Sequence, residues 1–288
     1  MRVAAPVLGR TMIGVAARIF KPSASWGLLV LGACWGGACA PRAIEPIRFD
    51  STGLRPAADY RGLAVVLRRS VTAGGMLDRR RLADCIDRLD AQLALLAVTG
   101  PDASPGLFVT EEDALAYWYN ARAAWAIKLA SLLEGDKPPR RELLEDRPFA
   151  LDGRTMTLCG IDAVLAGYDD WRVLVAAPDV RFSRAGLPAK PLSASNVHTR
   201  IAGRINEFLA DPKRVVLDVE RKEIRIPPVL WRFRGRIIEE HRKACGAEAA
   251  TFTTALLPHA SGRALRRLQD AAGFAAVPGL PYGEIAVK

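Results

Sequence analysis

Residues 111–130 read EEDALAYWYNARAAWAIKLA, and this stretch decides the fold. Its apolar residues recur at steps of three and four, which places one stripe of them along a helix, namely Ala114, Trp118, Ala121, Trp125 and Leu129. Alanine and isoleucine make much of the other side apolar as well, so we expect a helix that is buried almost all round. Thr110, followed by three acidic residues, is typical of a helix start.

Asn120 stands out because it is an amide in a helix with little polar surface near it. A buried amide must find partners or cost about 1–3 kcal/mol. In one interpretation Asn120 is a structural side chain bonded to neighbouring backbone. In the other it lies beside a cleft and binds a ligand, and the sequence leaves both open.

The composition describes a globular protein with a surplus of positive charge. Of its 288 residues 50% are hydrophobic and 25% charged, so the chain can bury a proper core. The formal net charge of +10 is spread along the chain and suits an anionic surface such as lipid head groups. Because no run of basic residues is interleaved with aromatic ones, we expect no nucleic-acid partner.

The N-terminal segment has the pattern of a secretory signal. Scattered basic residues precede the apolar run 26–31, and small residues follow it. The run is shorter than the roughly 20 residues that a membrane-spanning helix needs. Residues 31–34, LGAC, resemble the bacterial lipobox, in which the cysteine becomes the lipidated first residue. We predict an exported periplasmic protein of the cell envelope, held on the membrane by a lipid anchor at Cys34; the alternative is a plain signal peptide.

The periodicity along the chain predicts an α+β fold with a helical first half packed on a small sheet. We expect a signal peptide at 1–33, a tether at 34–58, a single domain at 59–275 and a C-terminal tail at 276–288. The expected helices cover 60–71, 79–98, 111–130, 159–166, 193–210, 231–244, 249–257 and 262–272. The expected strands form hairpins over 149–158, around an Asp-Gly turn, and over 215–226, with a buried strand at 173–177.

The three cysteines after the N-terminal segment are Cys85, Cys159 and Cys245, which lie far apart in sequence. No C-x-x-C motif occurs, and no pair of histidines has helical spacing, so we expect neither a metal site nor a cofactor. An exported protein can pair two of these cysteines, but the sequence does not choose which.

The order of the motifs resembles the bacterial and plant family called domain of unknown function 547. That family's Phe-Trp-Ile-Asn-x-Tyr-Asn-Ala helix corresponds to residues 117–124, YWYNARAA. Its Leu-Ser-Leu-x-x-Ile-Glu-His segment corresponds, in a shortened form, to residues 158–163, LCGIDA. Its Arg-Ile-His-Phe-Ala strand corresponds to residues 172–176, RVLVA, and its Phe-Leu-x-Asp-Pro motif corresponds to residues 208–212, FLADP. The resemblance covers about residues 79–240.

The resemblance implies a papain- or transglutaminase-like fold with a cysteine-hydrolase-like site, but this chain departs from the family at that site. Family members carry Asn-Cys-x-x-x-Ser-Cys-Pro directly after the strand, where this chain has residues 178–184, PDVRFSR. The family's histidine position is Ala163. We therefore expect a binding or scaffolding domain without catalysis. A solvent-open sulfur hydrogen-bonded to an imidazole would contradict this interpretation.

The alternative is a cysteine hydrolase or transferase that acts on peptide or cell-wall bonds through Cys159. This residue is expected at the start of a short helix, a place that favours a thiolate but also suits a structural cap. Catalysis would need one of His198, His241 or His259 within hydrogen-bond reach, and His198 is the candidate partner. Against this, His198 and His241 are expected on the surface.

A second candidate site lies in the loop after the predicted strand at 173–177. There Asp179, Arg181 and Arg184 are placed to contribute to a ligand pocket, with the two arginines binding an anionic group. The alternative is a solvated charged loop. The partner can be a small anionic molecule, a peptide or a protein, and the sequence does not choose among them.

Overall fold

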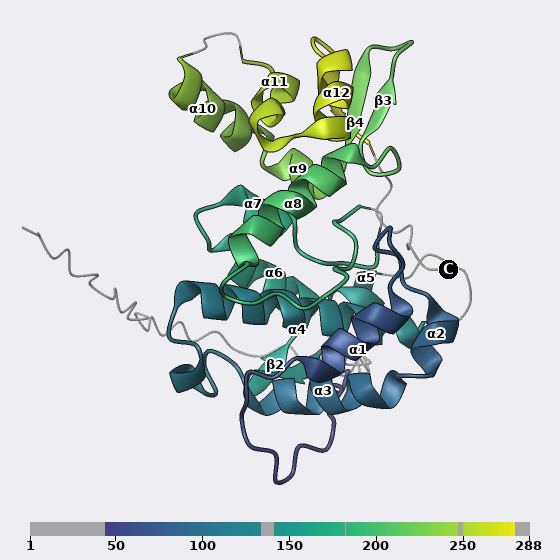
Figure 1. Ribbon diagram of the computed structural model, residues 1–288, viewed down its shortest axis with the longest axis vertical. Coiled ribbons are helices and arrows are strands. Elements are labelled where there is room, and N and C mark those ends of the chain that lie inside the picture. The colour runs from purple at the N-terminus through teal and green to yellow at the C-terminus, as the bar shows by residue number, and fades with distance from the viewer. Residues whose placement is uncertain (1–43, 134–140, 182, 247–249, 280–288) are drawn as a thin grey trace, which may run out of the picture. The chain divides into compact units, whose positions relative to one another are not determined.

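The computed structural model describes residues 44–133, 141–181, 183–246 and 250–279 (Figure 1). The predicted signal peptide, Cys34 and the end of the predicted tail lie outside the described residues. The helices and strands of the N-terminal part are α1 (Arg61–Ser70), α2 (Arg79–Ala83), α3 (Ile86–Val98), α4 (Glu111–Ser131), α5 (Arg141–Leu144), β1 (Phe149–Leu151), β2 (Arg154–Met156), α6 (Leu158–Ala166) and α7 (Trp171–Val175).

Those of the C-terminal part are α8 (Val197–Ala210), β3 (Val216–Asp218), β4 (Glu223–Ile226), α9 (Pro228–Arg232), α10 (Arg234–Cys245), α11 (Phe252–Leu256), α12 (Gly262–Asp270) and β5 (Ala275–Pro278). Single 3₁₀ turns occur at Pro105–Leu107 and Leu257–His259. The fold class is α+β, as predicted, whereas the papain- or transglutaminase-like fold stays a prediction.

Helix α4 is the centre of the helical half, as its sequence predicts. Every side chain from Leu115 to Ala130 is buried, and the helix packs against α3 and α6. The hydroxyl of Thr110 accepts a hydrogen bond from the backbone of Asp113, whose carboxylate accepts one from the backbone of Thr110. This capping box satisfies backbone donors at the helix start, so the predicted start is confirmed.

The predicted hairpin around Asp152 and Gly153 is also confirmed. Strands β1 and β2 pair antiparallel, and both turn residues have positive φ, as a tight hairpin turn requires. Phe149 stacks on Trp125 of α4, with ring centroids 4.0 Å apart. Ile47, in the stretch expected to be a tether, forms a parallel bridge with Phe149. The hairpin therefore anchors part of this stretch to the core.

The predicted buried strand at 173–177 is wrong, because the structure has helix α7 there. The carboxylate of Asp170 accepts a hydrogen bond from the backbone nitrogen of Arg172 at 2.9 Å and caps the helix. A short continuous apolar run is compatible with a buried strand and with a buried helix, so its length and hydrophobicity do not distinguish the two. The predicted helix at 79–98 is likewise two helices, α2 and α3.

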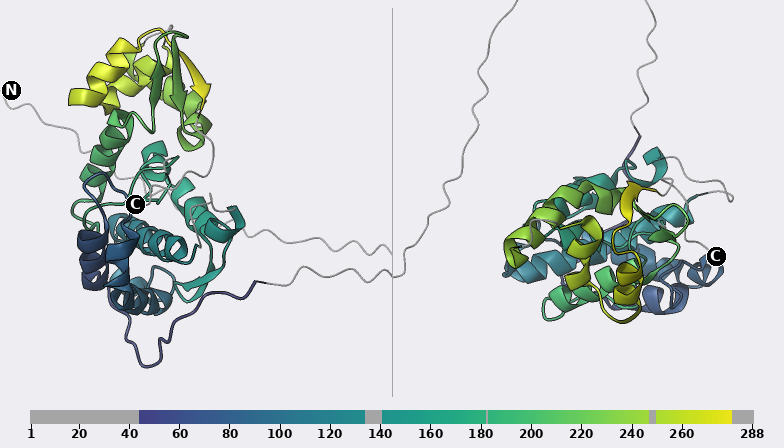
Figure 2. Two further views of the ribbon diagram at one scale, coloured as in Figure 1. Left: turned by 90° about the vertical axis from the view of Figure 1, so that its right-hand side faces the viewer. Right: turned by 90° about the horizontal axis from the view of Figure 1, so that it is seen from above.

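The second sheet lies with α12 at the opposite end of the described residues from α1–α3 (Figure 2). Strands β3 and β4 form the predicted antiparallel hairpin, and β5 pairs parallel with β4. Residues 276–278 were expected in a loose tail, which this pairing contradicts. None of the helices in the described ranges is both long and apolar enough to cross a membrane.

Candidate binding cavity

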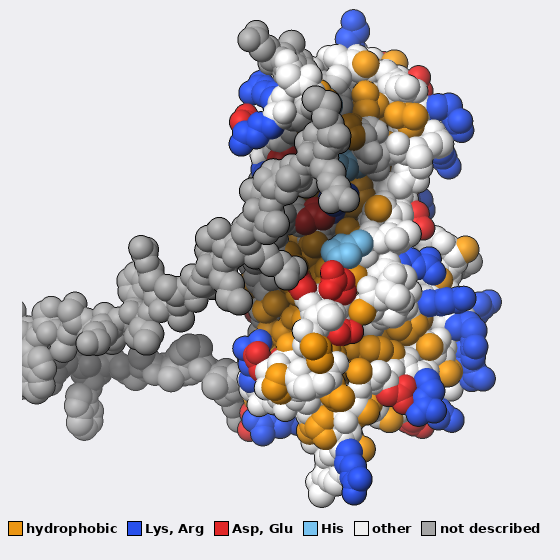
Figure 3. Space-filling model, turned by 60° about the vertical axis from the view of Figure 1, so that its left-hand side comes forward, with side chains coloured by type: hydrophobic (Ala, Val, Ile, Leu, Met, Phe, Trp, Pro, Cys, Tyr) orange, Lys and Arg blue, Asp and Glu red, His pale blue; other side chains and the backbone are white. Residues whose placement is uncertain are grey.

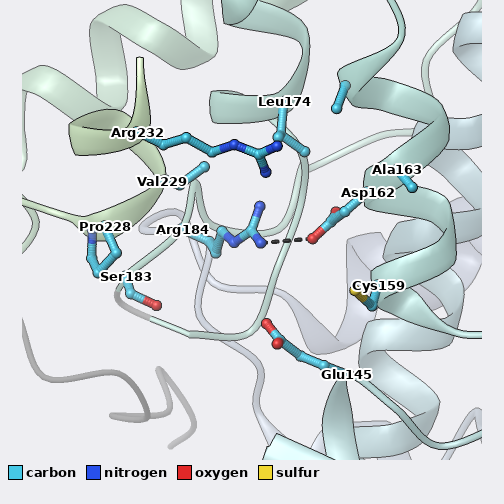
Figure 4. A pocket seen from close by; sticks show the side chains of 11 residues that line it. Glu145, Cys159, Asp162, Ala163, Leu174, Ser183, Arg184, Pro228, Val229 and Arg232 are labelled. Atoms are coloured by element: carbon cyan, nitrogen blue, oxygen red, sulfur yellow. Dashed lines mark hydrogen bonds and ion pairs between the residues drawn. The ribbon is translucent and has the colours of Figure 1, made fainter. Parts of the chain in front are cut away.

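A cavity of about 330 Å³ opens between α6, α7, α9 and the loop after α7 (Figure 4). Its walls combine small or aliphatic side chains with a few charged ones and one thiol. The lining residues are Glu145, Cys159, Asp162, Ala163, Ala166, Leu174, Ser183, Arg184, Pro228, Val229 and Arg232.

Helix α6 supplies one wall because of its spacing. Cys159, Asp162, Ala163 and Ala166 recur at steps of one, three and four residues, which brings them to one side of the helix. The hydroxyl of Thr157 accepts a hydrogen bond from the backbone of Gly160 at 2.9 Å and fixes the helix start. The small side chains on this wall leave the space that the cavity occupies.

Helix α9 supplies the opposite wall, with a proline at its first position, where no backbone donor is lost. The cavity-lining side chains of α9 are Pro228, Val229 and Arg232. Arg232 is an exposed residue, and its guanidinium group extends across the cavity toward Leu174, above the guanidinium group of Arg184 (Figure 4).

Behind the cavity lies a buried ionic network centred on Arg122 of α4. Its guanidinium group lies 2.7 Å from Asp162 and 3.0 Å from Asp179, and it also donates to the carbonyl oxygen of Pro178. Burial opposes the charge of Arg122, but the two aspartates outweigh it and raise the pKa of Arg122. A charge this deep is tolerated because every side of it is matched.

Arg181 extends the network to the residues before β1. Its guanidinium group donates to Asp179 and to Glu145, the latter at 2.6 Å. Burial opposes ionisation of Asp179, yet Arg181 and Arg122 outweigh it and hold the pKa of this carboxyl well below its ordinary value. Asp179 and Arg181 are each only 1% exposed, so the loop after α7 is not a solvated charged loop.

Two further arginines hold the backbone of this loop. Arg204 of α8 donates to the carbonyl oxygens of Ala176 and Gly186, at 2.8 and 2.5 Å. Arg214 donates to the carbonyl oxygens of Arg181 and Arg184. Guanidinium groups here supply hydrogen bonds to carbonyl oxygens of a largely buried loop. The loop therefore holds its shape without belonging to a sheet.

The structure separates the four predicted ligand-binding residues. Arg184 lines the cavity, where it donates to Asp162 at 2.6 Å. Asp179 and Arg181 lie in the buried network and are not among the lining residues. Asn120 is fully buried, and its amide makes two 2.8 Å hydrogen bonds with the backbone of Leu192. These contacts correspond to the structural interpretation of Asn120.

No family model, curated protein or solved structure matches this chain. The resemblance to the domain of unknown function 547 family therefore stays a prediction.

The candidate nucleophile Cys159 is exposed, and its thiol lines the cavity. The lining residues include no histidine. His198 instead lies at the surface, with its ring 3.5 Å from Glu112. His259 packs edge-on against Trp171, and burial lowers its pKa below the ordinary value for histidine. Neither histidine has a described contact with Cys159, so the predicted pairing of Cys159 with His198 does not occur in the structure.

A different thiol and imidazole do meet, at the end of α10. The sulfur of Cys245 lies 3.7 Å from Nδ1 of His241 at the protein surface. This contact contradicts the expectation that no open sulfur would be hydrogen-bonded to an imidazole. The two residues are four positions apart on one helix, which is a spacing the sequence displays. Neither lines the cavity, so the pair does not supply a base for Cys159.

Sequence reasoning missed most of the charged residues around the cavity. The sequence analysis did not identify four of them as site residues, namely Arg122, Glu145, Asp162 and Arg232. Only Arg122 gave a visible signal, because it is an arginine in the middle of an otherwise apolar helix. Cys85, Cys159 and Cys245 are free thiols in the structure. Across the described residues, no three His, Cys, Asp or Glu side chains are grouped to hold a metal ion.

The charge on the face shown in Figure 3 is mixed rather than gathered in one stripe. Lysine and arginine side chains occur at both ends of this face and along one edge, with carboxylates among them. The most exposed large hydrophobic side chains, Val109 and Val219, lie in separate parts of the chain. The cavity, rather than an exposed apolar patch, is therefore the candidate site.

Proposed function

We propose that this protein is a ligand-binding domain of the bacterial cell envelope, without catalysis of its own, and that its ligand occupies the cavity beside α6. The observation that carries the proposal is the cavity itself. Its volume of about 330 Å³ and its mixture of apolar walls with a few convergent polar groups are typical of small-molecule sites.

The surroundings of Cys159 support binding rather than catalysis. The cavity lining holds no imidazole that could take the proton of the thiol. Both carboxylates in the lining are already bonded to guanidinium groups, Glu145 to Arg181 and Asp162 to Arg122 and Arg184. Burial opposes ionisation of Asp162, but these arginines outweigh it and hold its pKa below the ordinary value, so it is a weak base.

A cavity-blocking substitution tests the binding proposal. Ala163 is an exposed lining residue on α6, so Ala163→Trp fills the opening with little cost to the fold. Ala83→Trp, at an exposed helical alanine elsewhere, is the matched control. In a thermal-shift screen of small fragments, hits that stabilise the wild type should lose their effect in Ala163→Trp and keep it in Ala83→Trp. Hits unaffected by Ala163→Trp, or no hits at all, would refute the proposal.

The envelope location rests on the N-terminal sequence. The pattern of residues 1–33 supports export, and Cys34 is the proposed lipid attachment site on the membrane. Metabolic labelling with a fatty acid should mark the wild-type chain and not Cys34→Ser. Absence of label on the wild type would exclude the anchor.

A second candidate function is a cysteine hydrolase or transferase acting on peptide or cell-wall bonds. The observation that favours it is the exposed thiol of Cys159 in the cavity wall. A thiol-directed activity probe should then label the wild type far faster than Cys159→Ser, whereas Cys245→Ser, which removes the thiol beside His241, should be labelled at nearly the wild-type rate. Labelling that depends on Cys245 and not on Cys159 would argue against this function.

A further inference from the structure

Two guanidinium groups face the cavity with hydrogen-bond donors to spare. The Nη2 atom of Arg184 donates to Asp162, but its Nη1 atom is buried and has no hydrogen-bond partner. Arg232 extends over the same cavity (Figure 4), with its guanidinium group 5.8 Å from the ring centroid of Phe233, and it forms no ion pair with any side chain in the described part of the chain. A buried donor left unsatisfied is costly, so a group that accepts from Nη1 of Arg184 is stabilised here, and the more exposed Arg232 adds a second positive charge beside it.

The negative charges of the cavity wall do not fill this need. Asp162 already accepts from Arg122 and Arg184, and Glu145 accepts from Arg181. Burial lowers the pKa of Arg184 in spite of the neighbouring Asp162, as expected for a cation that is incompletely neutralised. The lining therefore has more positive charge available to a ligand than negative charge.

Apart from Cys159 and Ser183, the rest of the wall is apolar and shapes the body of the ligand. The apolar lining residues are Ala163, Ala166, Leu174, Pro228 and Val229. They belong to α6, α7 and α9, so they surround the position between the two guanidinium groups on several sides. A fully charged or highly hydrated ligand would gain little from such walls.

We propose that the ligand is a small molecule with one oxyanion group and a compact apolar body, and that the oxyanion lies between Arg184 and Arg232. The oxyanion is a carboxylate or a phosphate monoester, both of which match the planar fork of an arginine. This inference rests on the proposed binding function and names the class of molecule that the cavity takes.

Binding of four matched probes to the purified full chain tests the inference by calorimetry. Benzoate and phenyl phosphate carry the two kinds of oxyanion on a ring, benzyl alcohol is neutral and benzylamine is cationic. At least one of the anions should bind about ten-fold or more tightly than benzyl alcohol, because a charge-assisted hydrogen bond contributes that much. Benzylamine should bind most weakly. The preferred anion identifies carboxylate or phosphate as the recognised group.

Arg232→Gln is the variant to use, because this side chain lies outside the buried network and its removal leaves the fold intact. It should weaken anion binding about ten-fold and leave benzyl alcohol binding unchanged. Arg242→Gln, at an exposed arginine of α10 that does not line the cavity, is the control and should change neither. High salt should weaken binding of the anions and not of the alcohol.

The outcomes separate this inference from the proposed function. If benzyl alcohol binds as tightly as both anions, or if Arg232→Gln leaves anion affinity unchanged, the anion preference is refuted while the binding function stands. If no probe binds, the inference is refuted; if the fragment screen also finds no hit that depends on Ala163, the binding function falls with it.

Discussion

Replacing Arg122 by methionine removes the cation at the centre of the buried network and keeps most of its apolar volume. The substitution leaves Asp162 and Asp179, which lie 2.7 and 3.0 Å from the guanidinium group, without this partner. The Arg122 side chain is fully buried and that of Asp179 is 1% exposed, so water does not replace the lost contact. Breaking a buried pair of this kind costs about 3–5 kcal/mol.

Urea unfolding monitored by tryptophan fluorescence measures this cost. With a typical slope for a domain, the midpoint of unfolding should fall by at least about 1 M in Arg122→Met while the slope stays unchanged. Arg61→Met is the control, because its ion pair with Asp59 is at the surface, where screening makes such pairs weak. Its midpoint should stay close to that of the wild type.

A double substitution checks that the effect comes from unpaired carboxylates. Adding Asp162→Asn to Arg122→Met removes one of the stranded charges, so the double variant should regain part of the lost stability. A destabilisation of less than about 1 kcal/mol by Arg122→Met, or strictly additive effects in the cycle, would refute the interpretation of this network as tightly coupled.

Further predictions concern a buried amide, two glycines and the acid stability of the buried network. Asn120→Leu should destabilise by about 2–3 kcal/mol, because it strands buried backbone groups, and should leave binding in the cavity unchanged. Gly100→Ala should lower the melting temperature, because a Cβ at this position would lie 2.2 Å from the carboxylate of Asp152. Gly203→Ala is the contrasting change: its Cβ would lie in open space on α8, so it should stabilise the fold by about 0.5–1 kcal/mol. Because the folded chain holds the pKa of Asp179 below the unfolded value of 3.8, stability should fall as the pH drops through that value, and a flat acid profile would contradict this.

The elements that sequence predicts well are those whose signals are local. The capping box at Thr110 and the hairpin turn at Asp152 and Gly153 depend on residues within a few positions of one another. The strand predicted at 173–177 failed because a five-residue apolar run carries no periodicity. Strand β5 was missed because its pairing with β4 joins residues about fifty positions apart, and only tertiary structure reveals it.

The site was predictable only in part for the same reason. Asp179, Arg181 and Arg184 are close in sequence, and the structure keeps them in one loop, but it turns only Arg184 to the cavity. The partners of Arg122 lie 40 and 57 residues away, and no pattern in a single sequence connects them. Which charges are neutralised, and which remain open to a ligand, follows from these distant contacts.

The loop after α7 is anchored from three places in the chain, and this affects the order in which the protein folds. Its carbonyl oxygens are bonded to arginines from α4, from α8 and from the turn after α8, at positions 122, 204 and 214. None of these bonds can form until the chain has already closed over long stretches, which slows the step that needs them. The loop after α7, which contributes Ser183 and Arg184 to the cavity wall, should therefore be among the last parts to become ordered during folding.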